Sequence, residues 1–266
     1  MNKLLQSRPT GLLAGKTALV LGIANKWSLA YAIAEGFARN GARLVLTYLG
    51  EKQKESIEEL SKPWNVAALL PCDVTKDEDL SALAEALAKL GGPVHAAVHS
   101  LAFANREDLA RPFLETSRAG FLLAQDVSAY SLVAVARATA PLMIEGGSLT
   151  TLTYLGSARV VPNYNVMGVA KASLEAAVRY LAHDLGPRQI RVNAISAGPV
   201  KTASARAVKD FSSILEAVPK CAPLRRNTEP AEVADAAVFL ASDLGRGLTG
   251  NILFVDAGMH VMGHSA

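Results

Sequence analysis

A tyrosine and a lysine seven positions apart are the first residues whose types and spacing could do chemistry. Tyr164 lies at the expected start of a helix, and Lys171 shares its face, because seven helical positions displace a side chain by only about 20° around the axis and roughly 10 Å along it. The phenol can donate a hydrogen bond to a developing oxyanion, and the ammonium can hold sugar hydroxyls. The alternative is a packed Tyr164 and an ordinary solvated Lys171. Apolar neighbours of Lys171 disfavour it: Met167, Val169, Ala170, Ala172 and Leu174.

The elements that must position these residues alternate along the chain. Short β-branched and apolar runs without alternation are typical of strands buried on both faces of a sheet. Seven such runs are predicted as strands: 17–23, 42–48, 66–74, 95–101, 148–154, 191–197 and 251–256. Helices are predicted between them: 28–40, 52–62, 77–90, 121–142, 166–185 and 230–242. This order predicts an α/β fold, a three-layer doubly wound Rossmann fold with a seven-stranded parallel sheet and a ligand crevice at the carboxyl ends of its strands.

A glycine-containing turn joins the first predicted strand to the first predicted helix. Gly22 would let the backbone turn without a side chain in the way, and the helix amino terminus at Ser28 would offer unpaired N–H groups and partial positive charge to a pyrophosphate. The G-x-G-x-x-G spacing is absent, so a plain strand-to-helix connection explains Gly22 about equally well.

The ends of the second and third predicted strands bear on which nucleotide could bind. Leu49 and Gly50 follow the second strand, where an acidic residue would hold the adenosine ribose. They also supply no cation for a ribose phosphate, which favours NADH over NADPH, although Lys52 and Lys54 leave NADPH open. Asp73 at the end of the third strand could accept a hydrogen bond from an adenine amino group, or could cap the helix that follows.

Length and composition fit one compact domain, residues 1–266. The chain is 50% hydrophobic, and its 27 Lys and Arg against 24 Asp and Glu give a net charge of +3, too small to imply nucleic-acid binding. No unbroken apolar run approaches the roughly 18 residues that would span a bilayer, so no membrane partner is expected. Cys72 and Cys221 lack the spacing of a disulfide scaffold or zinc site, and the opening residues lack a cleavable leader pattern. We therefore expect a cytoplasmic protein.

Several short motifs, highly specific in combination, carry a resemblance over nearly the whole chain. They are the turn 22–26 with 28–30, Asp73-Val74, the stretch 99–104, Tyr154-Leu155-Gly156, the stretch 162–168, Lys171 and the stretch 191–199. With them the chain resembles the enoyl-acyl-carrier-protein reductases of bacterial fatty-acid synthesis, a divergent branch of the short-chain dehydrogenase/reductase family. Ordinary members of that family use a Tyr-x-x-x-Lys spacing with a partner serine. Gly168 stands where that spacing would place the lysine, and Lys171 fits the longer enoyl-reductase spacing.

The resemblance implies that the protein transfers a hydride from NADH to the β carbon of a trans-2-enoyl thioester. It implies that Tyr164 meets the thioester carbonyl, that Tyr154 lines the acyl pocket and that Lys171, the third catalytic residue, binds the nicotinamide ribose. The other implied cofactor residues are Gly22, Ser28, Leu29, Leu49, Asp73, Val74, Leu101, Val200, Lys201, Thr202, Ala203 and Ser204; Ala104 is implied to face substrate. Ala102 stands where relatives often carry Gly, which affects the expected width of the acyl pocket. An acyl carrier protein is the implied partner, and a homotetramer the implied assembly.

The segment 198–226 is expected to form a lid over the acyl chain. Its apolar residues Phe211, Ile214, Leu215 and Val218 recur at helical spacing. Its cations could meet an acidic carrier protein or its phosphopantetheine: Lys201, Arg206, Lys209, Lys220, Arg225 and Arg226. A solvated helical excursion is the alternative reading of this segment.

The histidines do not indicate a metal site. His260 and His264 are four positions apart, as in some helical metal sites, but Gly258, Gly263 and the nearby chain end favour a tail. His99 is expected to be a hydrogen-bonded residue of a strand.

Two other functions remain open at this point. A carbonyl reductase of the same fold would act on a 3-oxoacyl or other ketone substrate, but the missing serine and the longer spacing disfavour it. A non-catalytic nucleotide-sensing module would keep the fold and lose the chemistry, but the presence of both Tyr164 and Lys171 disfavours it. An enoyl reductase should act on a crotonyl thioester, and a carbonyl reductase should act on an acetoacetyl thioester instead. Inactivity on every enoyl thioester would favour the nucleotide-sensing module.

Overall fold

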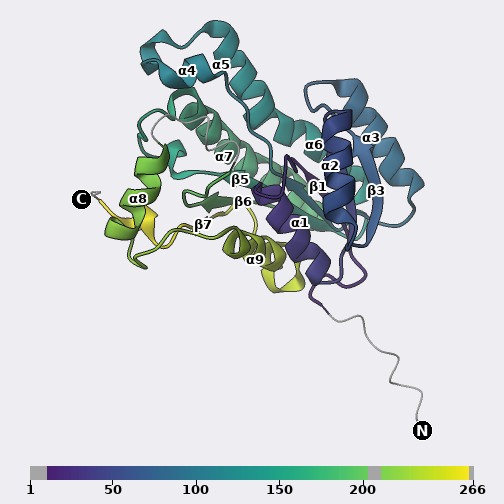
Figure 1. Cartoon of the computed structure of the whole chain (residues 1–266). Coiled ribbons are helices and arrows are strands. Elements are labelled where there is room, and N and C mark those ends of the chain that lie inside the picture. The colour runs from purple at the N-terminus through teal and green to yellow at the C-terminus, as the bar shows by residue number, and fades with distance from the viewer. Residues whose placement is uncertain (1–10, 203–210, 264–266) are drawn as a thin grey trace.

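The computed structural model describes residues 11–202 and 211–263, which form a seven-stranded sheet between helices (Figure 1). The strands are β1 (Thr17–Leu21), β2 (Arg43–Tyr48), β3 (Val66–Pro71), β4 (Ala96–His99), β5 (Gly147–Thr153), β6 (Ile190–Ala197) and β7 (Ile252–Val255). Their order is β3-β2-β1-β4-β5-β6-β7, and every neighbouring pair is parallel. The predicted doubly wound fold is confirmed, and the strand order reverses between β1 and β4, where such sheets place their ligand crevice.

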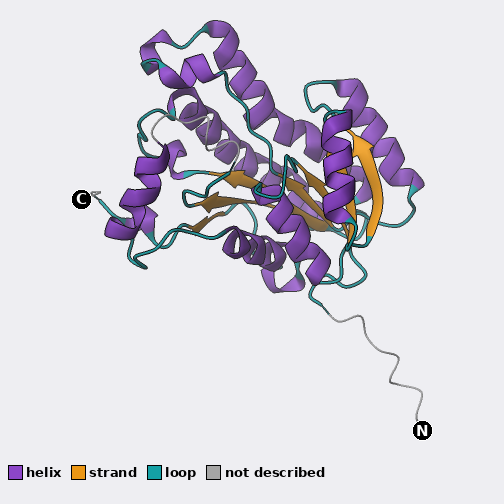
Figure 2. Cartoon of the chain, viewed as in Figure 1, coloured by secondary structure: helices purple, strands orange, loops and turns teal. Residues whose placement is uncertain are grey.

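Helices cover both faces of this sheet (Figure 2). They are α1 (Leu29–Arg39), α2 (Glu51–Ser61), α3 (Asp77–Lys89), α4 (Arg106–Ala110), α5 (Arg118–Gln125), α6 (Ser131–Thr139), α7 (Asn165–Leu185), α8 (Phe211–Cys221) and α9 (Pro230–Ala241). Buried residues of α1, α2 and α9 form one core cluster with the strands, and buried residues of α3, α6 and α7 form another. The sheet therefore has a hydrophobic core on each side, as a three-layer fold requires.

Strand β1 shows why its sequence is an unbroken apolar run. Leu19 and Leu21 belong to the core cluster shared with α3, α6 and α7, whereas Ala18 and Val20 belong to the cluster shared with α1 and α9. Successive side chains of a strand point to opposite faces of the sheet. A strand covered on both faces therefore needs apolar residues at every position.

The prediction of one continuous helix over residues 121–142 is wrong, because the helix is interrupted in its middle. A π-helical turn, Asp126–Tyr130, separates α5 from α6, and a 3-10 turn, Ala140–Leu142, ends the run. Such π turns are rare and are frequent at functional sites. The helical run Arg118–Leu142 is long and apolar enough to cross a membrane by length and composition, with a mean hydropathy of 1.4 over an 18-residue window, but half of that window is buried inside the protein, as in a core helix.

Two helices lie beside the carboxyl ends of the strands. α8 confirms the helical spacing predicted within the segment 198–226, although residues 203–210 lie outside the described residues. α4 is absent from the predicted elements, because its five residues are too few to show a helical period. Residues from both helices border the cavity that contains the candidate site.

Candidate active site

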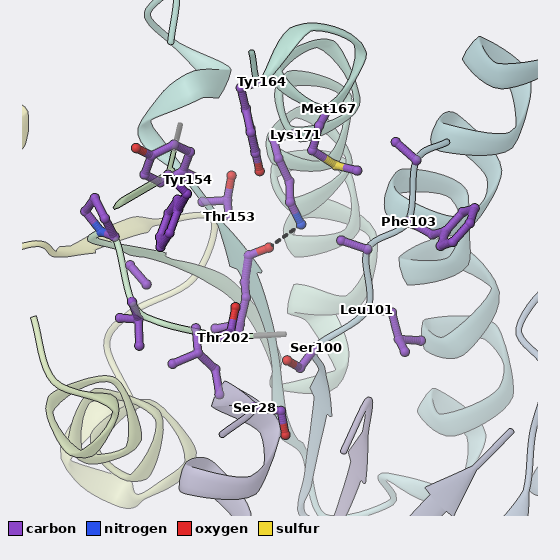
Figure 3. Close-up of a pocket in the computed structure, with 18 of the residues that line it drawn as sticks. Ser28, Ser100, Leu101, Phe103, Thr153, Tyr154, Tyr164, Met167, Lys171 and Thr202 are labelled. Carbon is purple, nitrogen blue, oxygen red and sulfur yellow. Dashed lines mark hydrogen bonds between the residues drawn. The ribbon is translucent and has the colours of Figure 1, made fainter. Parts of the chain in front are cut away.

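A cavity of about 680 Å³ lies at the carboxyl ends of β1, β4, β5 and β6 (Figure 3). It brings together many of the predicted site residues: Gly22, Ser28, Leu29, Leu101, Ala104, Tyr154, Tyr164, Lys171, Val200 and Thr202. Figure 3 shows Tyr154 and Tyr164 on one side of the cavity and Leu101 and Phe103 on the other, with Lys171 between them. The structure therefore places residues from widely separated parts of the chain around one space.

Lys171 reaches the cavity from α7, and Tyr164 is the N-cap residue of the same helix. Lys171 is only 5% exposed to solvent. Its Nζ donates a hydrogen bond of 2.8 Å to the carbonyl oxygen of Leu152. Among the described residues this carbonyl is the only hydrogen-bond acceptor of the amine, although an ammonium carries three donors. The other donors remain available to a ligand in the cavity.

The rings of Tyr154 and Tyr164 pack edge to face, with their centroids 5.0 Å apart. Burial raises the pKa of Tyr154 to about 12, and the negative charge of Asp256 adds to this rise. Burial raises the pKa of Tyr164 further still, with contributions from Tyr154 and Glu175. Both phenols therefore keep their protons at neutral pH and act as hydrogen-bond donors, as stabilisation of an oxyanion requires.

The charge of Lys171 depends on a balance between burial and a nearby acid. Burial lowers the pKa of the Lys171 amine to about 8, while the negative charge of Glu175 opposes that shift. Glu175 lies one turn further along α7, where its Oε1 accepts a hydrogen bond of 2.6 Å from the Thr153 hydroxyl. Lys171 is therefore mostly protonated at neutral pH, but with a much smaller margin than a solvated lysine.

Two glycines allow the Tyr164 ring to lie where it does. A Cβ atom at Gly156 would lie 2.5 Å from Cδ1 of Tyr164, so the ring packs directly on this glycine. A Cβ atom at Gly168 would lie 2.7 Å from the carbonyl oxygen of Gly156. Position 168 therefore has no room for the lysine that the shorter spacing would place there. The sequence shows both glycines, but only the structure shows that they contact the tyrosine and each other.

The turn after β1 fits the diphosphate of a dinucleotide. Gly22 adopts a φ of 101°, and a Cβ atom there would lie 2.1 Å from the carbonyl oxygen of Ser100, so only glycine allows β1 and β4 to end this close together. Ser28 caps α1 by accepting a hydrogen bond from the N–H of Tyr31, and the first turn of α1 contains no acidic residue. The positive end of the α1 dipole therefore faces the cavity, and no carboxylate in the first turn of α1 compensates it.

Four predicted cofactor residues lie outside the lining of this cavity: Leu49, Asp73, Val74 and Lys201. The first three follow β2 and β3, on the other side of β1. Oδ1 of Asp73 accepts hydrogen bonds from the hydroxyl and the N–H of Thr75, which lower the pKa of its carboxyl. Thr75 lies outside α3, whose N-cap residue is Lys76, so Asp73 stabilises the turn before α3 and does not cap the helix; its Oδ2 lies 3.7 Å from Nζ of Lys76. Ala203 and Ser204 lie outside the described residues.

Gln53 connects the ends of β1 and β2. Its carboxamide accepts a hydrogen bond from the N–H of Leu49 and donates one of 2.7 Å to the carbonyl oxygen of Ile23. The side chain of Leu49 is 68% exposed, so its position depends largely on the backbone that Gln53 holds. Sequence reasoning did not find Gln53, because a glutamine in the first turn of a polar helix carries no distinguishing signal.

Two histidines have clear hydrogen-bond roles inside the fold. His99, at the end of β4, is fully buried and bonded through both ring nitrogens, which confirms its prediction as a satisfied strand residue. Nδ1 of His260 lies 2.9 Å from a carboxylate oxygen of Asp256, and its ring stacks on Phe254. His264 lies outside the described residues.

A family model, two related proteins and a solved structure each match most of the chain, and all are described as enoyl-acyl-carrier-protein reductases. The model of the family described as "Enoyl-(Acyl carrier protein) reductase" matches residues 22–260. A Bacillus cereus protein named enoyl-acyl-carrier-protein reductase (NADH) is 55% identical over 95% of this chain and 99% of its own length. A Staphylococcus aureus protein named as the NADPH enzyme is 50% identical over 94% of this chain and 98% of its own. The crystal structure of the Bacillus cereus reductase with NADP⁺ and an indole naphthyridinone superposes with a TM-score of 0.93 at 54% identity, covering 96% of this chain and 100% of that one.

Proposed function

Because the chain belongs to the enoyl-acyl-carrier-protein reductase family, we propose that Tyr154, Tyr164 and Lys171 carry out the family's reaction in the cavity at the carboxyl edge of the sheet. That reaction, a step of type II fatty-acid biosynthesis, reduces the double bond of a trans-2-enoyl thioester with NADH as hydride donor. The observation that carries the assignment of residues is the arrangement of the Tyr164 phenol and the Lys171 amine around one cavity with the β1–α1 turn.

The residues around the cavity fit a nicotinamide dinucleotide, which supplies a hydride when bound. The diphosphate would lie against Gly22, Ser28 and Leu29, where the α1 amino terminus favours an anion. The free donors of Lys171 would hold the nicotinamide ribose. The remaining cofactor residues are assigned to the nicotinamide side, namely Leu101, Val200, Lys201, Thr202, Ala203 and Ser204, and to the adenosine side, namely Leu49, Asp73 and Val74. The absence of a cation at Leu49 and Gly50 supports NADH as the preferred cofactor. The nearby cations Lys52 and Lys54 keep NADPH open as an alternative cofactor.

Tyr164 stabilises the charge that develops on the substrate. Hydride addition to the β carbon moves electrons toward the thioester carbonyl and forms an enolate, whose oxygen becomes negative. A hydrogen bond from a neutral phenol strengthens as that charge grows, which accelerates the reaction rather than only tightening binding. One such donor is worth about 3 kcal/mol. Tyr154 packs against the Tyr164 ring and lines the same pocket, so it holds the phenol in place.

Apolar side chains line the part of the cavity that we assign to the acyl chain of the substrate. Leu109, Met167, Phe211 and Ile214 line the cavity together with Ala104. Two of them come from α8, so this helix acts as the lid over the acyl chain. Closing apolar residues over the substrate excludes water from the developing enolate and strengthens its hydrogen bonds.

Exposed cations near the lid form the docking surface for the acidic carrier protein. We assign Lys201, Lys220 and Arg225 to it, because all three are exposed. Arg226 makes a bidentate ion pair with Glu232 and contributes less net charge to this surface. Arg206 and Lys209 of the predicted patch lie outside the described residues.

The family resemblance supports a cytoplasmic homotetramer built from one domain per chain. Exposed large apolar residues on the long helices support the assembly, because they would be covered in an interface: Leu122 of α5, Tyr130 of the π turn, and Val169 and Tyr180 of α7. Size-exclusion chromatography with light scattering measures the assembly directly.

The experiment that tests the function compares two thioesters. NADH oxidation is measured with crotonyl-coenzyme A and with acetoacetyl-coenzyme A at equal concentrations. Oxidation with crotonyl-coenzyme A alone supports the enoyl reductase. Oxidation with acetoacetyl-coenzyme A alone supports a carbonyl reductase instead, and no oxidation with any enoyl thioester supports a module without this chemistry.

A further inference from the structure

The loop after β4, residues 100–105, forms one wall of the cavity. All of its residues line the cavity, and none belongs to a helix or strand. Its backbone is held at Ser100, whose N–H bonds to Leu21, and at Asn105, whose carbonyl oxygen accepts from Leu109. Among the described residues, the backbone groups between these two points form hydrogen bonds with one side chain only, that of Ser128.

Ser128 satisfies both backbone groups of Phe103 with a single hydroxyl. Its Oγ accepts a hydrogen bond of 2.9 Å from the Phe103 N–H and donates one of 3.1 Å to the Phe103 carbonyl oxygen. A hydroxyl has one donor and two acceptor positions, so this use is complementary. Ser128 is fully buried, whereas the Phe103 side chain is half exposed. The hydroxyl therefore fixes the backbone in the middle of the loop.

The π-helical turn brings a second hydroxyl to the same region. Ser131 follows this turn, and its Oγ lies 2.7 Å from Nε2 of His99, the last residue of β4. The Ser131 hydroxyl also donates to the Val127 carbonyl oxygen, and Nδ1 of His99 lies 2.9 Å from Oγ1 of Thr151, so both ring nitrogens have a hydroxyl partner. Burial lowers the pKa of His99 to about 3, which keeps the ring neutral. One helical run thus holds the end of β4 through Ser131 and the following loop through Ser128.

We propose that Ser128 is a positioning residue for substrate, which sets the acyl-facing wall of the cavity by fixing the backbone of Phe103. This inference rests on the proposed function. Phe103 lies across the cavity from Tyr154 and Tyr164, whereas Ser28 lies at the end assigned to the nucleotide (Figure 3). Loss of the hydroxyl leaves the N–H and C=O of Phe103 without partners, so the loop moves to reach water. The fit of the enoyl chain changes, while the diphosphate turn keeps its shape.

The test replaces Ser128 by Ala and uses Thr139→Val as the matched control. Thr139 is also a buried hydroxyl residue on the same helical run, but its Oγ1 bonds to the Val135 carbonyl oxygen and it lies outside the cavity lining. Steady-state constants are measured with crotonyl-coenzyme A, with a long-chain enoyl thioester and with NADH. We expect Ser128→Ala to raise KM for the enoyl thioesters about fivefold to tenfold, with KM for NADH within about twofold. Thr139→Val should change neither constant.

Hydrogen exchange gives a readout that does not depend on the reaction. In the unchanged protein, the Phe103 amide should exchange more slowly than the amides of Leu101, Ala102 and Ala104, because only Phe103 donates to Ser128. Ser128→Ala should remove this difference, and Thr139→Val should keep it. Equal exchange rates across the loop in the unchanged protein overturn the proposal even if Ser128→Ala does not fold.

The kinetic result can also overturn the proposal. An equal rise in KM for NADH and for the enoyl thioesters would show that Ser128 supports the site as a whole rather than the acyl wall. An unchanged KM for the thioesters would show that the loop keeps its shape without the hydroxyl. If the unchanged protein reduces no enoyl thioester, the proposed function fails, and the exchange data still decide whether Ser128 holds the loop.

Discussion

The Nζ atom of Lys171 lies 2.8 Å from the carbonyl oxygen of Leu152, which fastens the middle of α7 to the end of β5. The neighbouring residues repeat this connection, because Thr153 of β5 donates to Glu175 of α7. The amine is therefore oriented before any ligand binds, with its charge at the cavity and with no second acceptor among residues 11–202 and 211–263. Preorganisation of this kind reduces the reorganisation that a binding or reacting ligand would otherwise require.

The roles proposed for Tyr164 and Lys171 predict a different kinetic defect for each residue, and two substitutions test that assignment. Tyr164→Phe removes the donor to the thioester oxygen, so kcat should fall by about a hundredfold while the affinity for NADH stays unchanged. Lys171→Ala removes the donors to the nicotinamide ribose, so kcat should fall and the Kd for NADH should rise at least about tenfold. Steady-state kinetics and fluorescence titration with NADH measure the two effects.

Tyr180→Phe is the control for these substitutions, because Tyr180 lies on the same helix but outside the lining of the cavity. It should leave both constants unchanged. Equal NADH affinities in the Tyr164 and Lys171 variants would mean that the roles of the two residues are wrongly divided.

The lowered pKa of Lys171 predicts that cofactor capture weakens at alkaline pH. The amine is charged below its pKa of about 8 and neutral above it, so kcat/KM for NADH should be constant at neutral pH and fall above about pH 8. Because Glu175 raises this pKa, Glu175→Gln should move the fall to lower pH, while the amide oxygen can still accept from Thr153. A profile flat to pH 10 in both proteins would show that the charge of Lys171 does not control capture.

The sequence was sufficient to predict the sheet and the placement of Tyr164 and Lys171 at one cavity. Buried parallel strands are unbroken apolar runs, and glycine-containing turns interrupt the helices, so the seven strands and most helices were placed within a few residues of their observed bounds. The seven-residue spacing was enough to put Tyr164 and Lys171 on one side of a helix, because a helical period relates positions within one element directly.

Relationships between distant residues were not predictable in the same way. The contact of Ser128 with Phe103 depends on a π turn, and no helical periodicity distinguishes one extra residue in a turn within the apolar run 121–142. The packing of Gly156 under Tyr164 depends on the path of the chain between β5 and α7. Asp73 is a further case, because its position allowed adenine binding or a helix cap, whereas the structure shows a turn closed by Thr75 before α3 begins.

The contact between Gly156 and Tyr164 predicts a specific loss of catalysis in Gly156→Ala. The added methyl group would lie 2.5 Å from Cδ1 of Tyr164, so the ring must move away from the substrate oxygen. We expect kcat to fall at least about tenfold and the free energy of unfolding to fall by about 1–3 kcal/mol. Gly186→Ala is the control, because a Cβ atom there meets nothing within 4 Å. Full activity of Gly156→Ala would show that the ring position is not critical.

The exposed cations at the end of α8 and in the turn after it predict a defect that depends on how the substrate is delivered. Lys220 and Arg225 are exposed, so an acidic carrier protein would gain attraction from them that a short coenzyme A thioester would not. The double substitution Lys220→Ala and Arg225→Ala should raise KM for an enoyl-carrier-protein substrate about threefold to tenfold, leave KM for crotonyl-coenzyme A unchanged, and weaken the salt dependence of the carrier reaction. Lys89→Ala, at the end of α3, is the control, because helices that return between parallel strands end at the opposite edge of the sheet from the cavity. An equal rise in KM for the two substrates would remove Lys220 and Arg225 from the docking surface.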